Sequence, residues 1–125
     1  MNTFNIDASD HSPRVILDAG RGLLEIKGNS TLEPAAEFYR QLEKWIHAFN
    51  LADANTRIVN FMLDDVNSQS VYWLQHVLQQ LEKLHKTRNA NMVVNWYYTP
   101  ANEKILRTGR KYLTTLHLPI NLVAA

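Results

Sequence analysis

Short β-type runs of apolar residues alternate along this chain with longer segments of helical periodicity. Residues 14–18 are rich in apolar and β-branched residues, and residues 23–27 form a second such run after Gly20 and Gly22. Glycine supplies the positive φ that a tight turn between antiparallel strands needs. We therefore expect a β-hairpin over this part of the chain.

The segment after the hairpin predicts an amphipathic helix that ends near Phe49. Ser30 and Glu33 have the spacing of a capping box, and Pro34 would then fall in the first helical turn, where a missing N–H costs little. Apolar residues then recur at three- and four-residue intervals, which predicts one buried stripe. The stripe consists of Phe38, Leu42, Trp45, Ile46 and Phe49.

The rest of the chain predicts three more strands and two more helices. A run that is apolar on both sides, over residues 57–63, is typical of a central strand. The full set is a strand over 57–63, an exit loop over 64–68, a helix from about Gln69 to Lys86, a strand over 92–98, a helix that begins at 99–102 and ends near Thr114 or Thr115, and a strand over 119–123. The face of the 69–86 helix that we expect to be buried carries Val71, Leu74, Leu78, Leu81 and His85.

The element order β-β-α-β-α-β-α-β predicts an α/β fold: a single domain over residues 1–125, with its core at about 14–123 and a mixed sheet of about five strands. Helices that connect strands imply parallel pairs joined by right-handed crossovers. Sites in such sheets gather at the carboxyl ends of the strands. Residues 64–69 and 98–102 are therefore the loops in which we look for a site.

Composition and charge narrow the function. The chain has no cysteine, so disulfides, thiolate metal sites and cysteine nucleophiles are excluded. Its five histidines form no metal-binding pattern, and phosphate-loop, dinucleotide and hydrolase motifs are absent, so we expect no metal and no cofactor. A net charge of +1 and a pI of about 8.1 are too mild to indicate nucleic acid. Without a signal peptide or a long apolar run, we expect a cytoplasmic protein and no membrane association.

Ser68 is the first candidate site residue, because it lies where a central strand passes into a helix N-terminus. A phosphate there would meet free backbone N–H groups and the positive end of the helix dipole. The alternative is that Asn67 or Ser68 is only an N-cap. Asp64 and Asp65 could bind Mg²⁺ or act as paired acids, or they could be solvated loop residues.

Two further groups are candidates for partner binding. Strand alternation predicts that Tyr97 is buried and that Trp96 and Tyr98 lie together on the other face, as exposed anchors for a partner or packed under a helix. Basic residues charge one side of the last helix, which is either a solvated face or a binding face for an acidic protein. They are Lys104, Arg107, Arg110 and Lys111.

Taken together, the residues from Ser9 to about Leu122 resemble the SiaC-like biofilm-regulatory phosphoproteins. The family's Asn-Thr-Ser-Ser corner falls on Asn67-Ser68-Gln69-Ser70, and its Trp-x-Tyr strand end falls on Trp96 and Tyr98. Other matching positions are Ser9 to Val15, Gly28, Ser30, Glu33, Phe38, Tyr39, Trp45, Glu103, Gly109 and Tyr112. Differences from the family pattern are Gln69 for a serine, Tyr72 for a lysine and Gln41 for a proline.

The resemblance implies a fold similar to the STAS domains of anti-sigma-factor antagonists, and a role. In the family a dedicated Ser/Thr protein kinase phosphorylates the corner threonine and a PP2C-type phosphatase restores it, while the unphosphorylated form binds and activates a diguanylate cyclase. On that alignment Ser68 is the phosphoacceptor. The partner-binding residues implied are Asn67, Gln69, Ser70, Trp96, Tyr98 and Glu103.

The leading hypothesis is thus a non-enzymatic signalling phosphoprotein that controls a diguanylate cyclase in biofilm and cyclic-di-GMP regulation. A second hypothesis keeps the binding role but makes the target an anti-sigma factor, as for a STAS-type antagonist. A third, of another class, is a small metal-dependent enzyme that uses Asp64 and Asp65.

Overall fold

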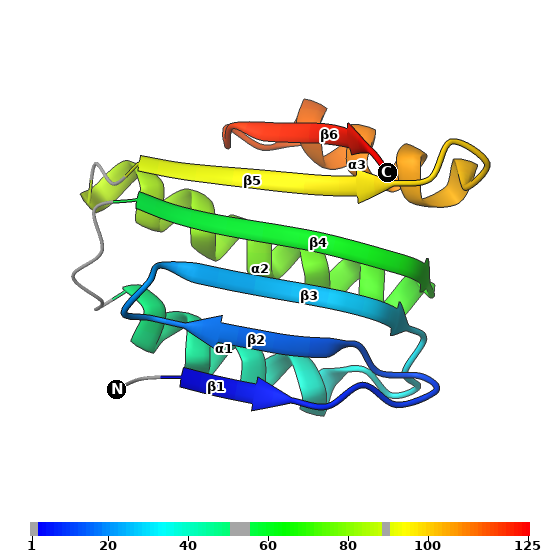
Figure 1. The fold of residues 1–125 in the computed structure, drawn as a ribbon, viewed down its shortest axis with the longest axis horizontal. Helices are drawn as coiled ribbons and strands as arrows, with labels where there is room; N and C mark the ends of the chain where they lie inside the picture. Colours follow the sequence, from blue (N-terminus) through cyan, green and yellow to red (C-terminus); the bar gives the residue numbers. More distant parts are fainter. Residues whose placement is uncertain (1–2, 51–55, 89–90) are drawn as a thin grey trace.

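A computed structural model describes residues 3–50, 56–88 and 91–125, and these form one six-stranded sheet with three helices (Figure 1). The strands lie side by side in the order in which they occur in the sequence. The elements are β1 (Thr3–Ile6), β2 (Arg14–Asp18), β3 (Leu23–Ser30), α1 (Ala36–Asn50), β4 (Thr56–Val66), α2 (Ser68–Arg88), β5 (Asn91–Tyr98), α3 (Glu103–Thr115) and β6 (Ile120–Ala124).

The α/β class, the hairpin and the central position of the 57–63 strand are confirmed. β2 pairs antiparallel with β3, and Gly22 in the turn has a φ of 66°. β3 to β6 are mutually parallel. The prediction of about five strands missed β1, which adds to β2 as an antiparallel edge. β1 is four residues long, with the half-buried Phe4 and Ile6 alternating with exposed residues, so its apolar pattern is too short to stand out.

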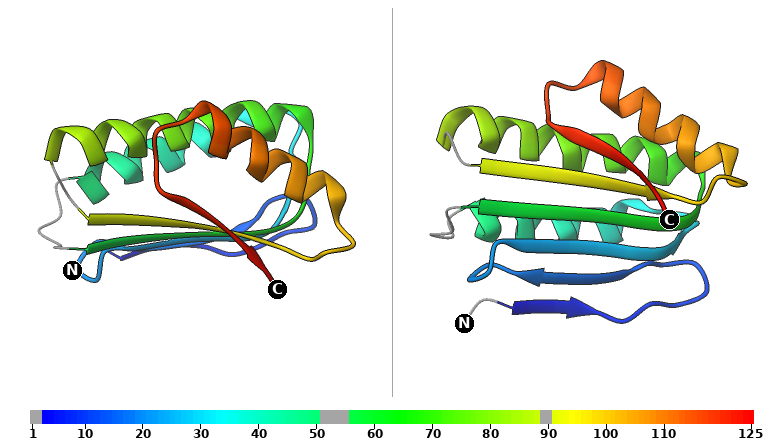
Figure 2. Two further views of the ribbon diagram at one scale, coloured as in Figure 1. Left: turned by 90° about the horizontal axis from the view of Figure 1, so that it is seen from above. Right: turned by 45° about the horizontal axis from the view of Figure 1, so that its top comes forward.

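All three helices lie on the same face of the sheet, and the opposite face carries none (Figure 2). The reason is topological. Each βαβ crossover moves one strand further in the same direction, and right-handed crossovers that never reverse place every helix on one side. The core therefore lies between the sheet and the helices, and the carboxyl ends of β3, β4 and β5 share one edge.

The helical stripes are largely as predicted. In α1 the side chains of Leu42 and Ile46 are buried, those of Phe38 and Trp45 pack against the core, and that of Phe49 lies outside the described residues. In α2 the predicted face is buried at Leu74, Leu78 and Leu81 and half-buried at Val71 and His85. Phe4 from the missed strand stacks on Trp45 with ring centroids 4.9 Å apart.

Two predictions beside the site were wrong for one shared reason. Ser30 does not cap a helix, because it is the last residue of β3 and α1 begins only at Ala36. Residues 64–66 are not an exit loop, because β4 runs to Val66. The hydrogen-bonded pairing of β3 with β4 continues past an irregularity at Gly28 and Asn29 and pairs Ser30 with Val66. This long-range pairing makes both segments part of the sheet.

Candidate functional site

The corner, residues Asn67 to Ser70, lies where β4 passes directly into α2, and Asn67 holds it in place. The Asn67 side chain accepts a hydrogen bond from the backbone N–H of Ser70 (2.8 Å) and donates one to the carbonyl of Leu32 (2.8 Å). Its own backbone N–H donates to the carbonyl of Ser30 (3.1 Å). Asn67 is therefore the N-cap of α2, and the alternative in which Ser68 is the cap is wrong.

Gln69 and Ser70, the next two corner residues, are committed to internal contacts. The Gln69 side-chain carbonyl accepts a hydrogen bond from the backbone N–H of Ala35 (2.9 Å), which ties the corner to the segment before α1. Ser70 is fully buried, and its hydroxyl accepts a hydrogen bond from Ser30 (2.8 Å). The Ser70 hydroxyl and the Gln69 side-chain carbonyl are therefore both occupied within the fold.

Three hydroxyl groups in the core, linked by hydrogen bonds, hold the corner from its buried side. Ser30, which bonds Ser70, also hydrogen-bonds the phenol of Tyr39 on α1, and all three residues are fully buried. Burial raises the pKa of Tyr39 to about 12, so the phenol stays neutral and remains a hydrogen-bond donor. The corner is thus positioned by β3, α1 and α2 together.

Ser68 differs from its neighbours in the corner because its side chain is exposed and has no hydrogen-bond partner within the described residues. Within the described part of the chain, no residue forms a hydrogen bond with its hydroxyl, and none accepts from the backbone N–H of Ser68 or Gln69. These N–H groups belong to the first turn of α2, where the helix leaves them unpaired. A nucleophilic hydroxyl therefore stands beside two free donors and the positive end of a helix dipole.

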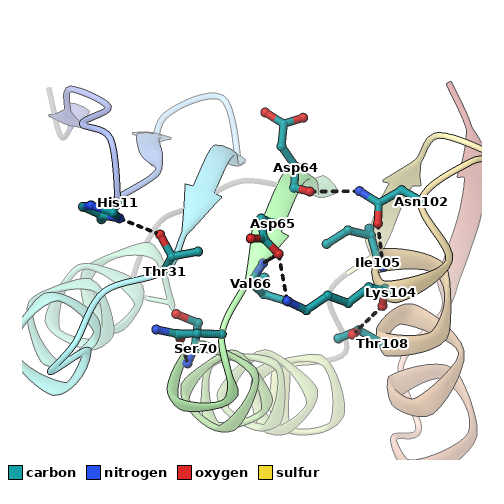
Figure 3. Close-up of polar contacts among 11 residues, drawn as sticks. His11, Thr31, Asp64, Asp65, Val66, Ser70, Asn102, Lys104, Ile105 and Thr108 are labelled. Atoms are coloured by element: carbon teal, nitrogen blue, oxygen red, sulfur yellow. Dashed lines mark hydrogen bonds and ion pairs between the residues drawn. The ribbon is translucent and has the colours of Figure 1, made fainter.

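The start of α3 closes the site on the other side (Figure 3). Asn102 caps α3 by accepting from the backbone N–H of Ile105 (3.3 Å), and its amide donates to the carbonyl of Asp64 (2.9 Å). Lys104 Nζ lies 2.8 Å from Asp65 Oδ1. This hydrogen bond from Lys104 holds the pKa of Asp65 below its usual range.

Asp64 and Asp65 do not form an acid pair. They are consecutive residues of β4 at the irregularity in its pairing with β3, and Figure 3 shows the carboxylate of Asp64 turned away from that of Asp65, which lies beside Lys104. Asp65 is engaged by Lys104 and by the backbone N–H of Val66. Within residues 3–50, 56–88 and 91–125, no group of three or more His, Asp or Glu side chains is placed to hold a metal ion. The geometry does not support the metal-dependent enzyme.

An open groove between α2 and α3 lies next to Ser68 and has a volume of about 470 Å³. We call it the α2–α3 groove. It is lined by Val66, Asn67, Ser68, Val71, Tyr72, Gln75, Lys104 and Lys111. The phenol of Tyr112 donates to the carbonyl of Val71 (2.7 Å), so α3 is joined to the first turn of α2 beside this groove.

Of the two alternatives for Trp96 and Tyr98, exposed anchors or packing under a helix, the second holds for Trp96, and the prediction that Tyr97 is the buried residue was wrong. Trp96 is 1% exposed, its indole N–H donates to the carbonyl of Ile105 (2.9 Å), and its ring packs against Gly109 of α3. Alternation places Trp96 on the helix-covered face, and α3 covers it. Tyr97 and Tyr98 are both half-buried, and Glu103 at the start of α3 is exposed.

An exposed aromatic residue lies instead on α2, at Tyr72, which entered the sequence comparison only as a difference from the family pattern. Tyr72 is 58% exposed and lies four residues after Ser68, on the same side of the helix. Its ring centroid is 4.6 Å from that of His76 and 5.7 Å from that of Trp73. Helical spacing from Ser68 would have identified Tyr72, whereas the contribution of Lys104 and Lys111 from α3 carries no local signal.

Comparison with known proteins assigns the chain to a family. Residues 6–125 match the model of the SiaC family regulatory phosphoproteins. The chain belongs to the SiaC family. A SiaC-family assignment agrees with the resemblance drawn from the corner, the Trp-x-Tyr strand end and the glycine of α3.

Individual relatives are distant in sequence and close in fold. The uncharacterized protein PA14_02130 of Pseudomonas aeruginosa (strain UCBPP-PA14) is 23% identical over 99% of this chain and 98% of its own length. Apo-SiaC from Pseudomonas aeruginosa superposes with a TM-score of 0.88 at 22% identity, covering 99% of this chain and 100% of that chain. A structure of the diguanylate cyclase SiaD in complex with its activator SiaC, from the same organism, matches with a TM-score of 0.86 at 22% identity, covering 98% and 99%.

At this level of identity the structural matches establish the fold, and the family match establishes the class of regulatory phosphoprotein. No helix in the described part of the chain is long and apolar enough to cross a membrane.

Proposed function

We propose that this SiaC-family protein is a non-enzymatic switch whose Ser68 is phosphorylated, and that only the unphosphorylated form binds and activates a diguanylate cyclase. The observation that supports the proposal is that Ser68 differs from the other three corner residues in its hydrogen bonding. Asn67, Gln69 and Ser70 are held by internal hydrogen bonds, whereas the Ser68 hydroxyl is exposed and unbound within the described structure. Phosphorylation at Ser68 therefore breaks no contact on which the fold depends.

The modification is an ordinary phosphoryl transfer. A Ser/Thr protein kinase would form a bond between Ser68 Oγ and the γ-phosphorus of ATP, the bond to the β–γ bridging oxygen would break, and the hydroxyl proton would leave through a base of the kinase. ADP departs. A PP2C-type phosphatase would reverse the modification by hydrolysis, releasing inorganic phosphate and restoring the hydroxyl. Both enzymes use cytoplasmic substrates, so the cytoplasm is the proposed place of action.

The proposed docking surface joins Ser68 to Tyr72, the large hydrophobic residue four positions further along α2. Aromatic residues of this kind are common anchors at protein interfaces. A phosphate on Ser68 adds roughly −1.5 to −2 of charge at neutral pH next to this anchor. Its desolvation and repulsion would then oppose binding. Asn67, Gln69 and Ser70 contribute by shaping the corner, and Glu103 is exposed at the adjoining end of α3.

Support for the cyclase as partner comes from the family. SiaC of Pseudomonas aeruginosa is the activator of the diguanylate cyclase SiaD, and the structure that contains both superposes on this chain over nearly its full length. A diguanylate cyclase from the organism that encodes this protein would be the partner to test first.

The test uses the purified protein, its kinase and its cyclase. We expect the kinase and ATP to add one phosphate to the wild-type chain and none to Ser68→Ala, with Thr114→Ala, an exposed residue of α3, as the matched control that is still phosphorylated. Cyclic-di-GMP synthesis should rise with the unmodified protein and Ser68→Ala, and should not rise with the phosphoprotein or Ser68→Asp. Phosphate found elsewhere, or full activation by the phosphoprotein, would refute the proposal.

A further inference from the structure

We propose that the α2–α3 groove is an intramolecular binding site for the phosphate group of phosphorylated Ser68. Lys104 and Lys111 bind the phosphate, and Lys104 gives up its ion pair with Asp65 to do so. This inference rests on the proposed function, since it concerns the phosphorylated form. The site itself is a property of this chain and needs neither the kinase nor the cyclase.

The groove brings the three residues together from distant parts of the sequence. Ser68 belongs to the first turn of α2, while Lys104 and Lys111 belong to α3, and all three line the same open groove of about 470 Å³. The two lysines are seven residues apart, which is close to two helical turns, so they project from the same side of α3. The hydrogen bond from Tyr112 to the carbonyl of Val71 holds α3 against the first turn of α2.

The charges around the groove favour an anion. Apart from the two lysines, the lining has one titratable side chain, Tyr72, among the residues that the structure describes. Lys104 is paired with the carboxylate of Asp65 on β4, which lies 2.8 Å away and does not line the groove. Lys111 forms no ion pair with any described residue. The free backbone N–H groups of Ser68 and Gln69 add two donors on the α2 side.

A phosphate can displace Asp65 from Lys104. The ion pair is exposed on both sides, with side chains 57% and 51% accessible, and exposed pairs contribute little to stability because water screens them. A phosphoserine carries roughly −1.5 to −2 of charge and three acceptor oxygens, against a single charge on the carboxylate. It is also attached to the wall of the groove, so no translational entropy is lost when it binds.

Capture of the phosphate would change the surface in three places. It neutralises Lys104 and Lys111, it releases the carboxylate of Asp65, and it fills the groove beside Tyr72. A partner that binds the groove through acidic groups then loses its cations and meets a freed anion. The switch would therefore act by rearranging the charges of α3 as well as by adding one to α2.

The experiment places phosphoserine at position 68 of the full chain by genetic encoding, and follows the phosphate by ³¹P NMR as a function of pH. The second pKa of a phosphoserine is ordinarily about 6. Two nearby cations should lower it by roughly half a unit to one unit in the wild-type background. Lys104→Gln with Lys111→Gln should return it to the ordinary value, and Asp65→Asn should lower it further, because Lys104 is then free.

The matched control removes two exposed cations that do not line the groove, Arg14 on β2 and Arg110 on α3. This Arg14→Gln, Arg110→Gln variant changes net charge equally and should keep the lowered phosphate pKa. In the same samples the pKa of Asp65 should rise on phosphorylation, since Lys104 has left it. We expect all variants to fold because the substituted side chains are exposed, and circular dichroism checks this.

An equal phosphate pKa in the lysine variant and in wild type would overturn the proposal, as would an unchanged pKa of Asp65. Failure of the proposed function gives a different result. If the phosphoprotein still activates the cyclase while its phosphate pKa depends on Lys104 and Lys111, the intramolecular binding site stands and the switch does not.

Discussion

Replacing Asn67 by alanine should destabilise the fold, because this side chain forms two hydrogen bonds that nothing else can supply. It caps α2 by accepting from Ser70, and loss of an N-cap costs about 1 kcal/mol. It also donates to the carbonyl of Leu32, and a hydrogen bond of this kind contributes about 1 kcal/mol. The sum of about 2 kcal/mol is a large part of the 5–15 kcal/mol typical of a domain.

Ser68→Ala is the matched control, because it removes a hydroxyl of the adjacent residue that has no hydrogen-bond partner in the described structure. Its unfolding free energy should lie within about 0.5 kcal/mol of wild type. Urea titration followed by circular dichroism measures both variants, and the denaturant slope should stay constant. A thermal scan should show Asn67→Ala melting roughly 5–10 °C lower.

The assignment of the corner is wrong if Ser68→Ala loses as much stability as Asn67→Ala. Ser68 would then be the residue that caps α2, its hydroxyl would be engaged, and phosphorylation would have to break a contact that stabilises the helix. A loss with Asn67→Ala alone leaves Ser68 available for modification.

Three further predictions concern the contacts that hold α3 against the site. Gly109→Ala places a Cβ 2.4 Å from the ring of Trp96, which is fixed by its hydrogen bond to Ile105. The cost of overpacking, about 1–3 kcal/mol, should outweigh the gain of about 1 kcal/mol in helix propensity, so the variant should be less stable. A urea titration that finds the variant more stable would contradict the packing of Trp96 on Gly109. Tyr112→Phe should lower stability by about 1 kcal/mol through loss of the bond to Val71, and no loss would mean that the phenol is bonded to water instead. In Lys104→Gln the lowered pKa of Asp65 should rise to about its ordinary value of 3.8, as measured by ¹³C NMR, and an unchanged pKa would refute the ion pair. The small stability that the ion pair contributes is present above the unfolded-state pKa of Asp65 and is lost as the pH falls through its lower folded-state pKa.

Much of the fold was predictable because its signals are local. Apolar periodicity placed α1, α2 and α3 and the strands from β2 to β6 close to their observed bounds. Errors arose where pairing partners far away in the sequence decide the outcome. Ser30 reads as a helix cap in isolation, but pairing with Val66 extends β3 through it, and the buried hydroxyls of Tyr39 and Ser70 then satisfy its side chain.

The site was only partly predictable for the same reason. Ser68 was identified because a strand that leads into a helix N-terminus is recognisable from local residue types. Alternation along a strand gives two faces but does not say which one the helices cover, so only the structure decided that Trp96 is packed under a helix and not exposed. Lys104 and Lys111 could be seen as a basic face of α3, yet nothing local indicates that this face meets the first turn of α2.

The sequence by itself determined the order of elements from β2 to β6, the class of fold, the family and the position of the candidate phosphoacceptor, since all four depend on residue types at fixed local spacing. Only the tertiary structure decided that Asn67 takes the cap and leaves Ser68 free. It alone placed Ser68 in one groove with Lys104 and Lys111. These features depend on contacts between segments about 30 to 40 residues apart, and such contacts exist only after the sheet has brought the ends of its strands to one edge.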